Sequence, residues 1–182
     1  MMVPITFRII LLLYLINLPS NQCTVLLPKR DADLIVKTCA RTDSPDLCGA
    51  ALRSDPRSSS ADVKGLAQIM LELSLAKAKD ILKRIHQLND GTKDPILKRY
   101  YGTCIEEYEA TVINDLPEAM SELNAKDYPS SRTNADYAAE TAVECENFFH
   151  GPPEARKSPL TKENNAMHDL AAIAASIIYI LG

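Results

Sequence analysis

Residues 167–181, Met-His-Asp-Leu-Ala-Ala-Ile-Ala-Ala-Ser-Ile-Ile-Tyr-Ile-Leu, decide the fold that we expect for this 182-residue chain. The apolar members recur with spacings of three and four: Met167, Leu170, Ala171, Ala174, Ile177, Ile178 and Leu181. This spacing places the apolar side chains on one face of a helix, as in an element laid into the core of a helical bundle. The stretch therefore predicts an all-α protein in which this helix is the last of several.

Three further segments have helical periodicity: residues 61–89, 95–123 and 135–149. The composition agrees, because the chain has no Trp and only six Gly, and small or straight side chains lose little rotamer freedom in a helix. Pro117 lies inside the second segment, where it predicts a kink because it removes a backbone hydrogen bond and clashes with the preceding turn. Four long helices with short connections predict an up-down-up-down four-helix bundle.

Turn and capping residues set the expected ends of these helices. A serine at the end of the segment 54–60 is expected to cap the first long helix, and Asn89-Asp-Gly91 to end it. Asp94-Pro95 and Ser158-Pro159 are expected to begin the second and fourth long helices, since proline at the first helical position gives up an amide that has no partner anyway. Residues 126–132 are the predicted connection between the second and third.

Five cysteines add a disulfide framework: Cys23, Cys39, Cys48, Cys104 and Cys145. Cys23 lies where a leader peptide would be cleaved, so it is lost or left unpaired. The other four permit three pairings, of which a local bridge from Cys39 to Cys48 is the simplest. Residues 31–41 and 44–52 flank that pair and read as a short N-terminal helical hairpin. Zinc is disfavoured because the spacings contain no C-x-x-C and no adjacent histidine.

The N-terminus reads as a signal peptide. Arg8 precedes the apolar run from Ile9 to Ile16, which is too short to span a bilayer and has the length of a secretory h-region. A buried N-terminal helix is the alternative. We expect residues 1–23 to be removed and the domain to occupy residues 30–182 of a secreted, oxidised protein that crosses no membrane.

Charge and chemistry exclude several classes of function. A net charge of −4 and a pI near 5.4 argue against nucleic-acid binding and favour a neutral or basic partner. The three histidines, His86, His150 and His168, are far apart in sequence and accompany no nucleophile motif. Carboxylates cluster on two helices without paired Glu-x-x-His motifs, so a di-iron site is not supported. These carboxylates are Glu106, Glu107, Glu109, Glu144 and Glu146. We expect no catalysis, no cofactor and no metal.

Several short segments of the sequence resemble the plant pectin methylesterase inhibitor and invertase inhibitor family, and they extend over nearly the whole mature chain. They are Pro-Asp-Leu-Cys48, Ser54-Asp-Pro-Arg-Ser-Ser, Val63-Lys-Gly-Leu-Ala, Leu97-Lys-Arg-Tyr-Tyr-Gly-Thr-Cys104, Leu116-Pro-Glu-Ala, Lys126-Asp-Tyr128, Cys145-Glu-Asn-Phe-Phe and Ser158-Pro-Leu-Thr-Lys-Glu-Asn. The resemblance implies a four-helix bundle with an N-terminal hairpin and bridges from Cys39 to Cys48 and from Cys104 to Cys145. It also implies secretion to the apoplast.

The resemblance further implies a non-catalytic mechanism that needs no cofactor. An inhibitor of this family, a monomer when free, covers the active-site cleft of a carbohydrate enzyme in a 1:1 complex. The expected contact surface is the exposed side of the second and third long helices with the connection 126–132. Within that connection the expected contact residues are Lys126, Asp127, Tyr128 and Pro129.

The sequence of the same connection bears on which enzyme is the target. Family inhibitors of cell-wall invertase resemble one another in a Pro-Lys-Phe loop there, whereas this chain has Lys126-Asp-Tyr-Pro-Ser-Ser131. The pectin methylesterase inhibitors often carry Gly-Asp-Tyr, which Lys126-Asp-Tyr128 approaches, and Thr-Cys-Glu-Asp where this chain has Glu144-Cys-Glu-Asn147. We expect inhibition of pectin methylesterase. The alternatives are inhibition of cell-wall or vacuolar invertase, as for the pollen proteins of the family described as invertase inhibitors, and a secreted bundle without an enzyme target. A small-molecule carrier is disfavoured because the Ala-rich third helix predicts tight packing.

Overall fold

The computed structural model describes residues 29–152 and 154–182, and every regular element in these two ranges is helical. The elements are α2 (Lys29–Cys39), α3 (Pro45–Ser54), η1 (Pro56–Ser60), α4 (Val63–Gly91), α5 (Pro95–Ala110), η2 (Thr111–Asp115), α6 (Leu116–Ala125), α7 (Tyr128–Phe148) and α8 (Thr161–Tyr179). The predicted all-α class is confirmed. The predicted signal peptide and Cys23 lie outside the described residues.

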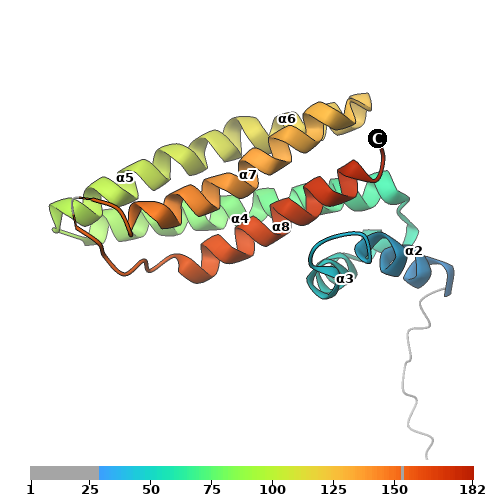
Figure 1. Cartoon of the computed structure of the whole chain (residues 1–182), viewed down its shortest axis with the longest axis horizontal. Helices are drawn as coiled ribbons and strands as arrows, with labels where there is room; N and C mark the ends of the chain where they lie inside the picture. Colours follow the sequence, from blue (N-terminus) through green and yellow to red (C-terminus); the bar gives the residue numbers. More distant parts are fainter. Residues whose placement is uncertain (1–28, 153) are drawn as a thin grey trace, which may run out of the picture.

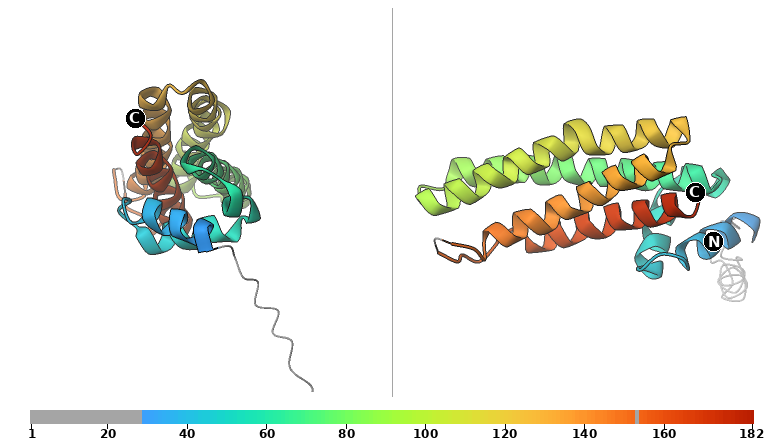
Figure 2. Two further views of the ribbon diagram at one scale, coloured as in Figure 1. Left: turned by 90° about the vertical axis from the view of Figure 1, so that its right-hand side faces the viewer. Right: turned by 45° about the horizontal axis from the view of Figure 1, so that its top comes forward.

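The long helices form the predicted up-down-up-down bundle, in which α5, η2 and α6 together make the second member (Figure 1). The bundle is elongated, and the hairpin of α2 and α3 lies across the end that also holds the C-terminus (Figure 2). Among the described residues, no helix is both long enough and apolar enough to cross a membrane.

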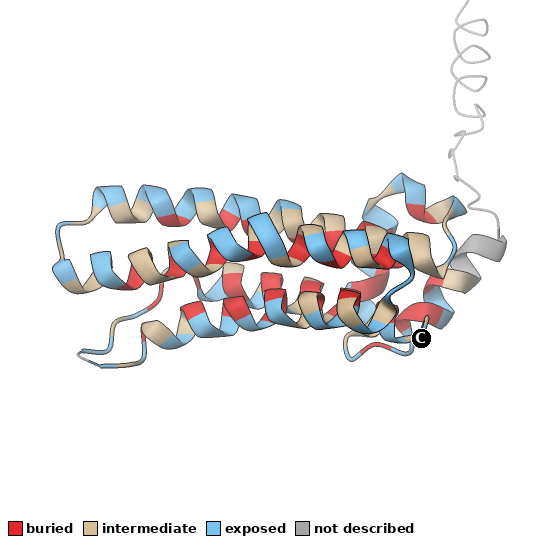
Figure 3. Ribbon diagram, turned by 90° about the horizontal axis from the view of Figure 1, so that it is seen from above, coloured by how far each residue is buried: buried red, intermediate tan, exposed pale blue. Residues whose placement is uncertain are grey.

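The core is one continuous cluster that runs the length of the bundle. Buried residues lie on the inner side of each helix and exposed residues on the outer side (Figure 3). Helix α7 contributes mostly small buried side chains, so its backbone comes close to that of α8: Ser131, Ala135, Ala138, Ala139, Thr141, Ala142 and Cys145. Tyr100, Tyr101 and Tyr108 belong to this core and are at most 4% exposed.

Two disulfides join neighbouring helices. Cys39 bridges to Cys48 within the hairpin, and Cys104 of α5 bridges to Cys145 of α7 across a Cα–Cα distance of 5.0 Å. Of the three pairings that four cysteines permit, this is the one that the family resemblance implies. The hairpin and the bundle thus each contain their own crosslink.

Three expected boundaries differ in the structure. Asp62, not a serine, caps α4: its carboxylate accepts from the Gly65 amide at 2.7 Å. Ser59 and Ser60 instead donate back into their own 3₁₀ turn. Helix α8 begins at Thr161, two residues after the expected proline, because the Ser158 hydroxyl accepts the Leu160 amide and forms a turn before the helix. The third boundary, between α6 and α7, lies at the candidate site.

Pro117 interrupts the second member of the bundle in an unexpected way. The helix does not break at the proline; it widens into the π-helical turn Thr111–Asp115, whose last hydrogen bond runs from the Leu116 amide to the Thr111 carbonyl. A π turn adds one residue to the turn, and Pro117 follows it as the second residue of α6. The Thr111 hydroxyl is 2.8 Å from that of Thr141 on α7, which fixes the turn to the neighbouring helix.

Candidate protein-binding surface

The side chains that could carry catalysis are dispersed. His86, His150 and His168 are 46–65% exposed and lie beside different carboxylates, Glu109, Glu146 and Asp169. Within the described ranges no three His, Cys, Asp or Glu residues are placed to hold a metal ion.

The connection between α6 and α7 is shorter and stiffer than the sequence suggests. Only Lys126 and Asp127 lie between the helices, because α7 already begins at Tyr128. The Asp127 amide donates to the Glu122 carbonyl and the Lys126 amide to the Leu123 carbonyl, which is the paired-bond pattern of a Schellman motif. The side chain of Asp127 then accepts the Ser130 amide and caps α7. One dipeptide thus ends one helix and begins the next.

Lys126 occupies the left-handed position of this motif with φ 65°. A residue with a β-carbon is strained there, whereas glycine is not. We expect Lys126→Gly to raise the free energy of unfolding by about 1 kcal/mol and Tm by about 2–4 °C, and thermal unfolding followed by circular dichroism measures this. Lys126→Ala keeps the β-carbon and is the control, for which no gain is expected. A gain of equal size in both variants would assign the effect to the lost charge.

The four predicted contact residues lie together at the end of the bundle that also holds the C-terminus. Lys126, Asp127 and Pro129 are exposed, while Tyr128 is half-buried. A β-carbon added to Gly182 would come within 3.1 Å of two Tyr128 atoms. Gly182, which follows α8, therefore packs directly on the side chain of Tyr128. The predicted contact residues are therefore supported from below by the end of the chain.

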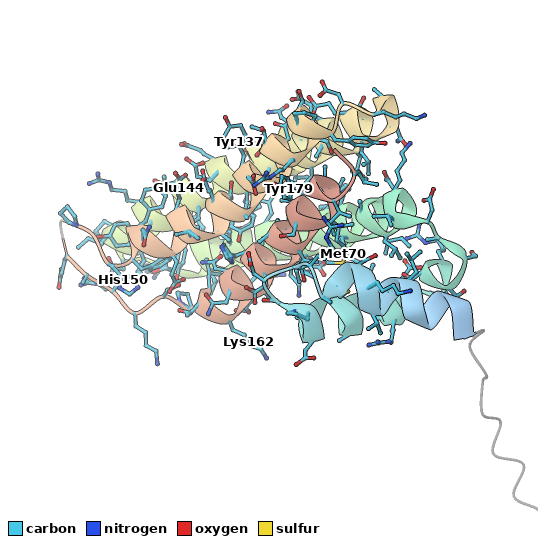
Figure 4. The ribbon with its side chains drawn as sticks, turned by 45° about the vertical axis from the view of Figure 1, so that its right-hand side comes forward. Met70, Tyr137, Glu144, His150, Lys162 and Tyr179 are labelled. Atoms are coloured by element: carbon cyan, nitrogen blue, oxygen red, sulfur yellow. A yellow bond between two sulfur atoms is a disulfide. The ribbon has the colours of Figure 1, made fainter. Side chains whose placement is uncertain are left out.

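An arginine and a tyrosine extend this corner onto the last helix. The Arg132 guanidinium stacks 4.6 Å from the ring centre of Tyr179, which is 63% exposed. Both residues, with Tyr128 and Pro129, line a hollow of about 170 Å³. Figure 4 shows Tyr179 of α8 and Tyr137 of α7 on neighbouring helices, with Glu144 further along α7. The sequence alone did not predict the pair of Arg132 and Tyr179. The one local hint is that Pro129 and Arg132 are three residues apart and therefore lie on one face of a helix.

The stretch of chain from Glu106 of α5 to Glu144 of α7 is strongly acidic. Residues 106–144 contain ten acidic side chains against two basic ones, Lys126 and Arg132. Burial, and then the charges of Glu144, Glu106 and Asp115, raise the pKa of the Glu107 carboxyl above its ordinary value. Carboxylates from two helices thus repel one another across this surface. A cationic partner would relieve that repulsion.

The same surface also exposes apolar side chains. Ile113, at the π turn, is 67% exposed and Tyr137 is 53% exposed. The π turn accounts for the exposure of Ile113. Widening the helix turns this residue outward, and the regular period of 3.6 residues does not hold across the turn. No local signal in the sequence indicates such a turn apart from Pro117 six residues after Thr111. Exposed apolar side chains thus occur among the carboxylates of this stretch.

Glu146 is a second residue that the sequence does not single out correctly. The sequence suggests that it belongs to an exposed strip of carboxylates, but its side chain is only 18% exposed. It accepts hydrogen bonds from Ser158, Thr161 and Asn164 at 2.6–2.9 Å. The Asn164 side chain also accepts the hydroxyl of buried Tyr108 at 2.8 Å. This network joins α5, α7 and α8 and is structural.

The described residues form a disulfide-linked helical bundle. Residues 33–177 match the family model described as plant invertase/pectin methylesterase inhibitor, and the chain belongs to that family. It is 39% identical to a pectinesterase inhibitor of Actinidia deliciosa over 84% of this chain and 82% of that one. It is 33% identical to a protein of Platanus orientalis named "Putative invertase inhibitor", over 83% and 91% of the two chains.

The fold agrees with a solved relative. A crystal structure of a mutant form of a pectin methylesterase inhibitor from Arabidopsis superposes with a TM-score of 0.70 and 26% identity, covering 81% of this chain and 97% of that one. The family predicted from the sequence is therefore confirmed, and with it the class of protein, an enzyme inhibitor.

Proposed function

We propose that this chain inhibits a plant pectin methylesterase by covering its active-site cleft in a 1:1 complex. The observation that supports this best is the acidic exposed side of α5, η2, α6 and α7, which ends at the rigid connection Lys126–Asp127. A pre-organised connection loses little conformational entropy on binding, so more of its contact energy becomes affinity. Lys126, Asp127, Tyr128 and Pro129 are the proposed contact residues at that end.

The charge of this surface favours a basic enzyme. Opposite charges steer two proteins together and raise the association rate at low salt. The exposed apolar residues Ile113 and Tyr137 lie among the carboxylates and would supply the desolvated centre of the interface. The complex should therefore form more slowly as salt is added while its dissociation changes less.

Two enzyme classes remain candidates, and the connection favours the esterase. Lys126-Asp-Tyr128 approaches the Gly-Asp-Tyr of the esterase inhibitors, and the Pro-Lys-Phe of the invertase inhibitors is missing. The Schellman geometry offers a physical reason for this likeness, because Lys126 occupies the left-handed position that glycine prefers. The alternative, an invertase inhibitor, is supported by the resemblance to the Platanus protein and by the exposed Glu144 and Asn147, which depart from the esterase pattern.

Secretion belongs to the same proposal. Residues 1–23 act as a signal peptide, and the domain of residues 30–182 acts in the apoplast, where an oxidising environment keeps both disulfides formed.

A parallel titration tests the function. Oxidised protein of residues 24–182 is added to a plant pectin methylesterase and to a cell-wall invertase at mildly acidic pH, and residual activity is followed. The esterase is expected to lose activity linearly up to one equivalent while the invertase keeps its activity. Loss of invertase activity alone would replace the proposed target, and loss of neither would exclude both enzymes.

A matched pair of variants tests the surface. Ile113→Asp places a charge at the centre of the proposed interface and is expected to weaken esterase inhibition about tenfold or more. Val36→Asp makes the same change at a similarly exposed residue, 53%, on the hairpin and is expected to leave inhibition within about twofold. Equal inhibition by both variants would place the contact surface elsewhere.

A further inference from the structure

A hollow on the outer face of α4 carries a line of cations that the proposed inhibitor surface does not use. It has a volume of about 430 Å³ and is lined by Lys79, Leu82, Lys83, His86, Gln87 and Asp90. These positions recur with helical spacing, so the hollow follows one face of the helix for about 16 Å. Apart from half-buried Leu82, its lining residues are all exposed.

Helix α5 continues the line. His86 lies 3.8 Å from Glu109, so the hollow borders the α5 face that contains Glu109. Lys98 is eleven residues before Glu109, about three turns away and on the same face. Lys93 follows in the turn that joins α4 to α5 at that end of the bundle (Figure 1). The cations thus form one row from the middle of the molecule to its end.

The lysines of this row are free to bind an anion. Within the described part of the chain, Lys79, Lys83, Lys93 and Lys98 form no ion pair, in contrast to Arg84 on the adjoining face, which binds Glu163 at 3.2 Å. Four carboxylates lie near the row: Asp90 lines the hollow, Glu109 faces His86, Asp80 follows Lys79 in the sequence, and Asp94 beside Lys93 caps α5 and pairs with Arg156. Since the chain as a whole is acidic, such a row is a local exception to its charge.

We infer that this row binds a carboxylate polysaccharide, namely demethylesterified pectin; the choice of polymer rests on the proposed function. A pectin methylesterase uses water to cleave a methyl ester and releases methanol and a proton, which leaves a carboxylate on the sugar. Each reaction of the target enzyme therefore adds an anion to the polymer. A polymer with carboxylates on successive sugars can place them against successive turns of α4 while the acidic face of α5–α7 remains available to the enzyme. The inhibitor is thereby concentrated where the esterase has acted.

Retention of the full mature protein on immobilised polygalacturonate tests this inference. Retention is expected at about 0.02 M NaCl and is lost by about 0.3 M, because added salt screens exposed charges. Lys79→Glu with Lys83→Glu is expected to weaken retention about tenfold, whereas Lys157→Glu with Lys162→Glu changes the net charge equally and is expected to change it less than about threefold. Equal losses in both double variants, or no retention of the unmodified protein, would overturn the inference.

A competition with the unmodified protein removes any dependence on how the variants fold. Soluble oligogalacturonate should elute the protein, and its fully methylesterified form should not; elution by both would overturn carboxylate recognition. Esterase inhibition is measured separately with the same preparations. Retention without inhibition contradicts the proposed function alone, and inhibition without retention contradicts this inference alone.

Discussion

Replacing both Cys104 and Cys145 by alanine is expected to lower the free energy of unfolding by about 4 kcal/mol. The two residues are 41 positions apart, so the crosslink removes much of the conformational freedom of the unfolded chain. Both sulfur atoms are fully buried between α5 and α7, and their loss also leaves small gaps in the core. A domain of this size has about 5–15 kcal/mol in total, so the variant should unfold at a markedly lower temperature.

Urea unfolding of the oxidised protein and the variant measures this difference, with the midpoint compared at constant slope. The matched control is the double alanine variant at Cys39 and Cys48, which are separated by nine residues and should contribute about 3 kcal/mol or less. The expected order is set by loop length. A larger loss from the hairpin bridge than from the long one would show that the hairpin, and not the bundle, limits stability.

Periodicity and capping residues predict most of the fold. The heptad-like spacing of residues 167–181 and the Asp94-Pro95 start gave helices where the structure has α8 and α5, because both signals are local and strong. Asp62 was missed as a cap for the opposite reason: several serines nearby could serve, and only the 3₁₀ turn decides which residue stands at the helix start.

The candidate surface is harder to predict than the fold. Pro117 indicates a disturbance but not its form, which is a π turn whose Thr111 hydroxyl lies 2.8 Å from that of Thr141, thirty residues away. The connection 126–132 looks like a loop because it contains Pro129 and two serines, yet these form the first turn of α7. Tertiary contacts decide both cases, and a single sequence does not contain them.

Glu146 shows how a buried carboxylate is overlooked among exposed ones. Glu144 and Glu146 both flank Cys145, and nothing in their spacing separates them. The backbone turns Glu146 toward Asn164 and the segment before α8, while Glu144 remains exposed. A sequence signal does exist in retrospect, since Ser158, Thr161 and Asn164 repeat at intervals of three and present three donors to one acceptor.

Replacing Glu146 by alanine is expected to lower the free energy of unfolding by about 2–4 kcal/mol at neutral pH, because three donors lose a charged acceptor in a largely buried position. Burial raises the pKa of this carboxyl, but the hydrogen bonds from Thr161, Ser158 and Asn164, together with the charge of His150, outweigh burial and hold the pKa below its ordinary value. The carboxyl therefore binds a proton less readily in the folded state than in the unfolded state. Its contribution is complete above about pH 5 and is lost as the pH falls through the folded-state pKa.

Urea unfolding at several pH values between about 3 and 7 tests both statements. The difference between the unmodified protein and Glu146→Ala should shrink toward the acidic end. Glu146→Gln keeps the size and one acceptor, so it should cost less at neutral pH and differ little from the unmodified protein at low pH. Tyr108→Phe provides the control, since it leaves the Asn164 carbonyl without its hydroxyl donor but removes no group that titrates in this range, and its cost of about 1–2 kcal/mol should not vary with pH. A pH-independent cost for Glu146→Ala would mean that the carboxylate acts through its packing alone, and the three hydrogen bonds would then contribute nothing that depends on its charge.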